Sequence, residues 1–118
     1  MDDEVIFTRR ADAEILLEGD EHIRVYARTD KIVFAVGTLL PGQRSPVDPG
    51  HGGAHEVAYQ IEGEVVVHLP DRDRYYHLEP GDAMVVPEGE AHTVVCVSAT
   101  PAVTVWATAP NLGRPALG

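Results

Sequence analysis

The sequence has little of three features that would assign it to other classes of protein. It contains one cysteine, Cys96, which excludes an internal disulfide framework and suits a reducing cytosol. Nine basic residues stand against nineteen acidic ones, and the formal net charge of −10 disfavours nucleic acid and anionic membranes as partners. No apolar run approaches the ~18 residues of a membrane span. The chain starts with MDDE, which is acidic where a secretory signal is basic. We therefore expect a cytoplasmic protein.

The composition that remains is typical of one ordinary globular domain. Of the 118 residues, 44% are hydrophobic and 24% are charged, which is enough for a core but leaves no room for a second domain. We predict a single domain over residues 1–118, with an N-terminal arm over 1–20 and a C-terminal tail over 109–118. Within the arm, the short apolar runs fit either a short helix or an edge strand.

Hydrophobic patterning after residue 20 indicates β-strands. Residues 22–28 alternate polar and apolar side chains, and residues 32–40 form an apolar, β-branched run. The same reasoning predicts further strands over 57–61, 65–69, 75–78, 83–86, 93–97 and 102–108. Residues 45–53 are rich in proline and glycine and are predicted to be a loop. Short strands at this spacing indicate an all-β sandwich or barrel.

Two stretches concentrate side chains that bind metal ions. The first is HGGAHEVAYQIEG at residues 51–63, and the second is GDAMVVPEGEAH at residues 81–92. Histidine and one carboxylate on β-structure can form a facial metal site that leaves coordination positions open. These donors suit Fe, Mn, Zn, Ni or Cu, and the spacing does not choose among them. We predict one divalent transition metal as cofactor.

The two stretches resemble the paired motifs of the cupin superfamily, whose members are small double-stranded β-helix (jelly-roll) barrels. The second motif matches at Gly81, Pro87, Gly89 and His92, and the end of the first matches at Glu56 and Gly63. With its flanking strands the resemblance covers about residues 30–108. It implies an all-β cupin-type barrel over that range, with Glu56 and His92 as metal ligands.

The two histidines that the family places before its glutamate are not matched in register. Counting from the preceding glycine puts them at Asp48 and Gly50, whereas counting back from the glutamate puts them at Pro49 and His51. We predict His51 as a third ligand and Asp48 as a carboxylate substitute for the missing histidine. His55 is the adjacent alternative, although strand alternation sends it to the face opposite the glutamate.

Alternation also draws attention to Gln60. Glu56 and Gln60 share one strand face, so if the glutamate points into the barrel, the amide does too. A buried amide needs hydrogen-bond partners, which a protein core or a ligand can supply. Both readings are open, and we predict Gln60 as a substrate-binding residue.

These features, together with the resemblance, favour a metal-dependent enzyme acting on a small organic molecule in the barrel, of the dioxygenase or the lyase/isomerase type. The alternative is a metal-free cupin isomerase or cyclase, or a non-catalytic module that binds a small ligand, which the incomplete histidine pair favours. Residues 32–40 and 94–97 are apolar on both strand faces, and a barrel has one interior. We therefore expect a homodimer, which the resemblance to cupins also implies.

Overall fold

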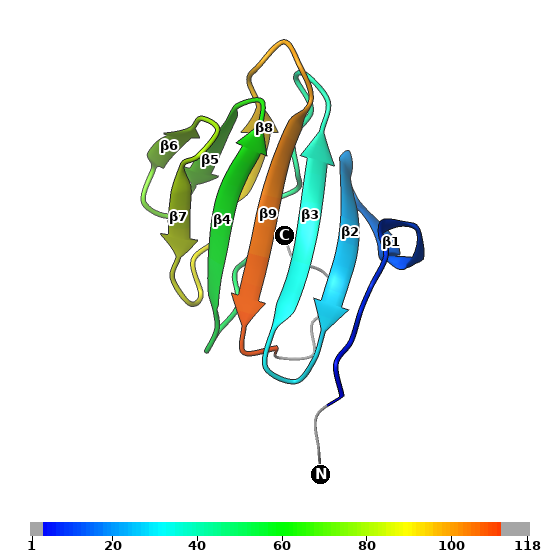
Figure 1. The fold of residues 1–118 in the computed structure, drawn as a ribbon. Coiled ribbons are helices and arrows are strands. Elements are labelled where there is room, and N and C mark those ends of the chain that lie inside the picture. The colour runs from blue at the N-terminus through cyan, green and yellow to red at the C-terminus, as the bar shows by residue number, and fades with distance from the viewer. Residues whose placement is uncertain (1–3, 112–118) are drawn as a thin grey trace.

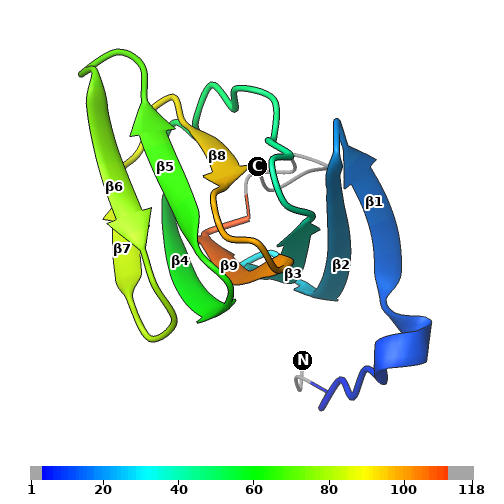
Figure 2. The same ribbon diagram turned by 90° about the horizontal axis from the view of Figure 1, so that it is seen from above.

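The computed structural model describes residues 4–111, which form two antiparallel β-sheets facing each other (Figures 1 and 2). A short 3-10 helix, η1 (Arg10–Asp12), precedes the strands. The strands are β1 (Glu14–Glu18), β2 (Glu21–Arg28), β3 (Val33–Leu39), β4 (His55–Glu62), β5 (Val65–Leu69), β6 (Arg74–Leu78), β7 (Ala83–Val86), β8 (Thr93–Cys96) and β9 (Ala102–Ala109). The larger sheet has the order β1-β2-β3-β9-β4-β7, and the smaller has the order β6-β5-β8. Within residues 4–111, no helix has the length and apolarity that crossing a membrane requires.

The all-β jelly-roll prediction is confirmed, and the predicted strands differ from the observed ones by two residues or fewer at each end. The N-terminal region contains both of the structures that its sequence left open, a helical turn and an edge strand. The larger sheet consequently starts at Glu14, ahead of the barrel range 30–108 that the resemblance implied. Of the predicted tail, residues 112–118 lie outside the described part of the chain.

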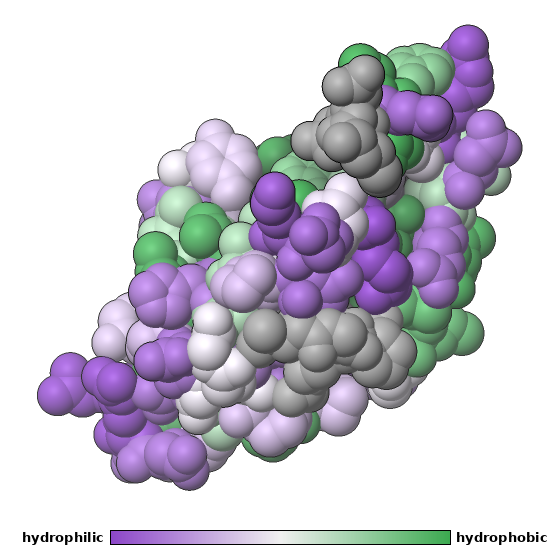
Figure 3. All heavy atoms as spheres, turned by 90° about the horizontal axis from the view of Figure 1, so that it is seen from below, coloured by the Kyte–Doolittle hydropathy of each residue, from purple (hydrophilic) through white to green (hydrophobic). Residues whose placement is uncertain are grey.

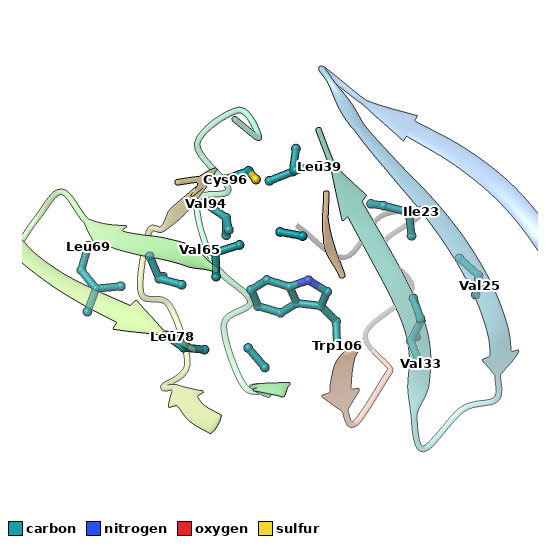
Figure 4. Close-up of a cluster of buried hydrophobic side chains, with 14 residues drawn as sticks. Ile23, Val25, Val33, Leu39, Val65, Leu69, Leu78, Val94, Cys96 and Trp106 are labelled. Atoms are coloured by element: carbon teal, nitrogen blue, oxygen red, sulfur yellow. The ribbon is translucent and has the colours of Figure 1, made fainter. Parts of the chain in front are cut away.

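The core lies between the two sheets, because alternate residues of each long strand face inward. In β4, burial alternates from His55 to Gln60, with the even-numbered residues buried. Figure 4 shows the indole ring of Trp106 at the centre of the cluster, with Val65 and Val94 on one side and Val33 on the other. Burial of these apolar side chains supplies the main driving force for closing the two sheets.

The predicted loop over residues 45–53 runs beside β8 and extends the smaller sheet irregularly. Arg44 pairs with Val95, and Asp48 pairs with His92, as isolated β-bridges. Between them, the hydroxyl of Thr93 donates to the carbonyl oxygen of Ser45 at 2.7 Å. The loop is therefore held against the strand that follows the second motif.

Candidate metal centre

Four predicted ligands come from three chain segments that meet inside the barrel. Asp48 and His51 lie in the loop before β4, Glu56 is the first inward-facing residue of β4, and His92 directly precedes β8. All four are buried, with exposed fractions of 7%, 3%, 1% and 0% in that order.

Backbone hydrogen bonds bring the loop and the second motif together. The amide of Asp48 donates to the carbonyl of His92 at 2.8 Å, and the amide of His92 donates back at 2.9 Å. Gly50 has a φ of +90°, and a Cβ there would lie 2.7 Å from the backbone of Glu90, so only glycine fits. The turn at Gly50 lets Asp48 and His51 both face inward. One candidate ligand from each of the two motif counts is therefore buried at the centre.

Donor atoms of three of these side chains converge, and Nε2 of His92 lies beside one of them. Nε2 of His51 lies 3.0 Å from Oε1 of Glu56 and 3.9 Å from Oδ2 of Asp48. One ligand atom from each of these three residues lies within 4.8 Å of the others. Nε2 of His92 lies 3.6 Å from the same Oε1 of Glu56.

Further contacts fix the direction of two of these side chains. Nδ1 of His92 donates to the carbonyl oxygen of Glu90 at 3.0 Å, so the proton sits on Nδ1 in the neutral ring and Nε2 faces Glu56. Oδ1 of Asp48 accepts a hydrogen bond from the amide of Gly50 at 2.7 Å, which leaves Oδ2 on the side of His51.

The residues present fit a metal ion. Nε2 of His51 lies within ion-pair distance of Oε1 of Glu56. Within the described residues, that nitrogen and both carboxylate oxygens of Glu56 are buried without a hydrogen-bond partner. Buried polar atoms are normally hydrogen-bonded, and exceptions call for another partner. A cation among these donors would satisfy all three atoms, and two imidazoles with two carboxylates are ligands for a transition metal.

The charged groups of the centre shift one another's pKa values. Burial alone would raise the pKa of Glu56, but its contacts with His51 and His92 lower it below the usual 4.5. Burial alone would lower the pKa of His92, but Glu56 and the carbonyl of Glu90 raise it to about 9. The carboxylates therefore stabilise one positive charge in the place where the donor atoms meet.

Two further sequence predictions concern β4. His55 is exposed on the outer face, as alternation predicted, and does not join the cluster. Gln60 is fully buried, but its amide is engaged by the protein: Nε2 donates to the carbonyls of Glu62 and Gly63, and Oε1 accepts from the hydroxyl of Thr104 at 2.7 Å. These contacts lie at the bulge between Gln60 and Glu62, where the pairing of β4 with β9 shifts register. They give Gln60 a structural role, and its contact with substrate stays a prediction.

Sequence reasoning missed a buried carboxyl, Glu21, on the inner face of β2. Burial, followed by the nearby charge of Glu18, raises the pKa of Glu21 from 4.5 to about 8. The signal was present in the sequence, because Glu21 shares a strand face with Ile23 and Val25, both of which are buried. A glutamate on the apolar face of a strand is unusual enough to single out.

Comparison with known proteins agrees with this arrangement. The sequence profile of the Cupin domain matches residues 35–108. KdgF from Halomonas sp. is similar in structure, with a TM-score of 0.79, 18% identity, and coverage of 93% of this chain and 97% of that chain. The polyketide cyclase RemF from Streptomyces resistomycificus has a TM-score of 0.75 and 22% identity over 96% of this chain and 83% of that one. A predicted oxalate decarboxylase from Thermotoga maritima has a TM-score of 0.77 and 18% identity over 90% of this chain and 100% of that one.

Such identities show a common fold and nothing further about activity. Among curated proteins, no significant sequence match was found.

Proposed function

The chain belongs to the Cupin domain family, and from that premise we propose that it is a metal-dependent enzyme acting on a small organic molecule inside the barrel. The observation that carries the proposal is the convergence of buried donor atoms from Asp48, His51 and Glu56, with Nε2 of His92 3.6 Å from the same glutamate. In particular, both oxygens of Glu56 are buried without a hydrogen-bond partner among the residues that the structure describes. His51 and His92 lie within ion-pair distance of this carboxylate, and a metal ion would supply the direct bonds to its oxygens that the two imidazoles do not make.

The chain's own residues would do three things at this centre. Asp48, His51, Glu56 and His92 would hold one divalent transition metal, with His92 oriented by the carbonyl of Glu90. Burial of the donors would exclude bulk water from the ligands. When bound, such a metal supplies Lewis acidity or a centre for activating O₂. Both a lyase or isomerase and a dioxygenase fit this description, and oxygen consumption during turnover would separate them.

The second candidate function is metal-free catalysis or ligand binding. Two observations favour it: Pro49 stands where one count expects a histidine, and the low pKa of Glu56 beside the high pKa of His92 describes an ion pair that neutralises itself. A polyketide cyclase and a predicted oxalate decarboxylase both share the fold, so the fold does not choose between the two candidates.

Metal occupancy of matched histidine variants tests the first proposal. His92→Ala removes a ligand, whereas His77→Ala removes an exposed histidine that contacts Glu64 outside the centre. We expect the first variant to lose most of its metal and the second to retain the wild-type content, measured by mass spectrometry of the untagged proteins. Equal metal content in the two variants would contradict the ligand assignment.

We also propose that the protein is a homodimer in a reducing compartment such as the cytosol. Large apolar side chains are exposed on the outer face of the larger sheet, from β3, β4 and β7: Phe34, Val57, Tyr59, Ile61 and Val85. A second copy would cover this face by a two-fold interface between equivalent sheets. In the view of Figure 3, hydrophilic residues occupy much of the visible surface, and hydrophobic residues are seen along the right side and at the upper left.

Light scattering tests the dimer. The expected mass is twice the 12.8 kDa of one chain, and Tyr59→Lys on the exposed face should shift the mass towards that of the monomer. A wild-type mass of one chain at micromolar concentration would contradict the proposal.

A further inference from the structure

Glu21 is a buried carboxyl that the metal centre does not use. It lies on the inner face of β2 with 2% of its surface exposed, and within residues 4–111 its Oε1 has no hydrogen-bond partner. Burying a carboxyl without a partner destabilises a fold, whichever protonation state it adopts. Its presence therefore calls for a reason other than stability.

Gly37 makes room for this carboxyl. It lies on β3, the strand beside β2, with its place on the inner face. A Cβ at this position would collide with Oε2 of Glu21. The φ of Gly37 is not in the left-handed region, so its backbone conformation does not require glycine. A glycine inside a strand marks the close approach of another group, which here is the glutamate side chain.

A second buried polar atom without a partner lies beside the same glycine. Nε1 of Trp106, on β9, is 3.4 Å from the point where a Cβ of Gly37 would stand. This indole N–H is buried, since only 1% of the residue's surface is exposed, and it also lacks a hydrogen-bond partner in the described part of the chain. In Figure 4 the nitrogen is on the edge of the ring nearer to Leu39 and Ile23.

The two atoms lie next to the candidate metal centre. The imidazole of His92 stacks on the indole of Trp106, with 5.9 Å between ring centroids and 29° between planes. The indole that carries this N–H therefore stacks directly on the ring of a proposed metal ligand, His92. A molecule bound at the metal would reach the two atoms by extending past the ring of His92.

We propose that Glu21 and Trp106 form a binding pair for a hydroxyl group of the substrate. The indole N–H is only a donor, and the Glu21 carboxyl keeps an acceptor oxygen in either protonation state, so a group that both accepts and donates complements the pair. A hydroxyl or enol does so: its oxygen accepts from Nε1 of Trp106, and its proton is donated to Glu21. The substrate class is thus a small metal-chelating molecule with one further hydroxyl group, an inference that rests on the proposed metal-dependent function.

Stability gives the first test, with a matched control in the same core. Glu21→Met keeps an unbranched side chain next to Gly37 and removes the carboxyl, so the melting temperature should rise. Gln60→Met removes a buried amide that has three hydrogen bonds, so the melting temperature should fall. A fall for Glu21→Met comparable to that of the control would show that Glu21 is a structural residue and would overturn the proposal.

Ligand binding gives the second test. Allomaltol and kojic acid are pyranones that chelate metal through the same two oxygens, and kojic acid carries one additional hydroxyl. Zinc-loaded wild-type protein should bind kojic acid about fivefold more tightly, the effect of about one hydrogen bond. Trp106→Phe and Glu21→Met should each abolish that preference while zinc content stays at the wild-type level.

The two tests separate this inference from the metal-dependent function. Wild-type protein that binds zinc but shows equal affinity for the two pyranones, or binds neither, would overturn the hydroxyl pair and leave the metal centre intact. Failure of the wild type to bind zinc and each of the other candidate ions would contradict the proposed function, whereas the stability comparison of Glu21→Met with Gln60→Met still decides whether Glu21 is structural. If Trp106→Phe does not fold, Glu21→Met alone decides the ligand-binding test, as it already decides the stability test.

Discussion

The buried carboxyl of Glu21 makes a specific prediction about how stability depends on pH. Burial raises its pKa from 4.5 to about 8 in the folded state, and each pKa unit corresponds to about 1.36 kcal/mol. Between those two pH values the folded chain binds a proton that the unfolded chain has released. The free energy of unfolding therefore falls as pH rises through this window, by up to about 5 kcal/mol in total.

The window can be divided so that Glu21 acts alone in its lower part. His92 also has a raised pKa, about 9 against an ordinary 6.5, so its contribution to stability is present below 6.5 and is lost as pH rises to 9. The lowered pKa of Glu56 acts in the opposite direction, below pH 4.5. Among the groups with shifted pKa, only Glu21 makes stability fall from pH 4.5 to 6.5, by about 3 kcal/mol.

Urea unfolding of metal-free protein between pH 4.5 and 9 measures this effect. We expect Glu21→Met to abolish the fall in unfolding free energy between pH 4.5 and 6.5, and to leave above pH 6.5 only the part of the fall that His92 contributes. Gln60→Met is the control, because it lowers stability without removing a titratable group, and its pH dependence should parallel that of the wild type. Parallel curves for wild type and Glu21→Met would refute the account of this carboxyl.

Three further predictions concern the metal centre and its neighbours. Asp48→Ala should lower metal occupancy, while His55→Ala, an exposed change, should leave it unaltered; mass spectrometry that finds the reverse would make His55 the substitute ligand. Gln60→Met should reduce the unfolding free energy by about 2–3 kcal/mol through loss of its hydrogen bonds, with metal content retained; loss of metal would instead make Gln60 a ligand. Metal affinity should rise about tenfold per pH unit up to about pH 9, because His92 must release its proton on binding; calorimetry in buffers of different ionisation enthalpy that finds no proton release would contradict this.

The strands were predictable because each depends on local sequence. Alternation along residues 22–28 and 57–61, and glycine or proline between strands, specify where extended segments begin and end. The order of strands in the two sheets did not follow from these patterns, and the family resemblance implied only the jelly-roll architecture.

The candidate site was only partly predictable, because its geometry depends on contacts between distant segments. The position of Asp48 opposite His92 arises from a β-bridge across the molecule, and the inward turn of His51 depends on the left-handed conformation of Gly50. The inward direction of Gln60 followed from alternation, but its partners did not, since they include carbonyl groups exposed by the bulge at the end of β4. Neither feature has a signature in the local sequence.

Metal stoichiometry of the untagged wild-type protein tests the central claim most directly. The convergence of Asp48, His51, Glu56 and His92 predicts one transition-metal ion per chain, either as purified or after addition of Zn²⁺, Mn²⁺, Fe²⁺, Ni²⁺ or Cu²⁺. Binding should also raise the melting temperature, because an ion that binds only the folded state stabilises it. Protein that contains no metal, takes up none of these ions stoichiometrically and shows no rise in melting temperature with any of them would contradict the account.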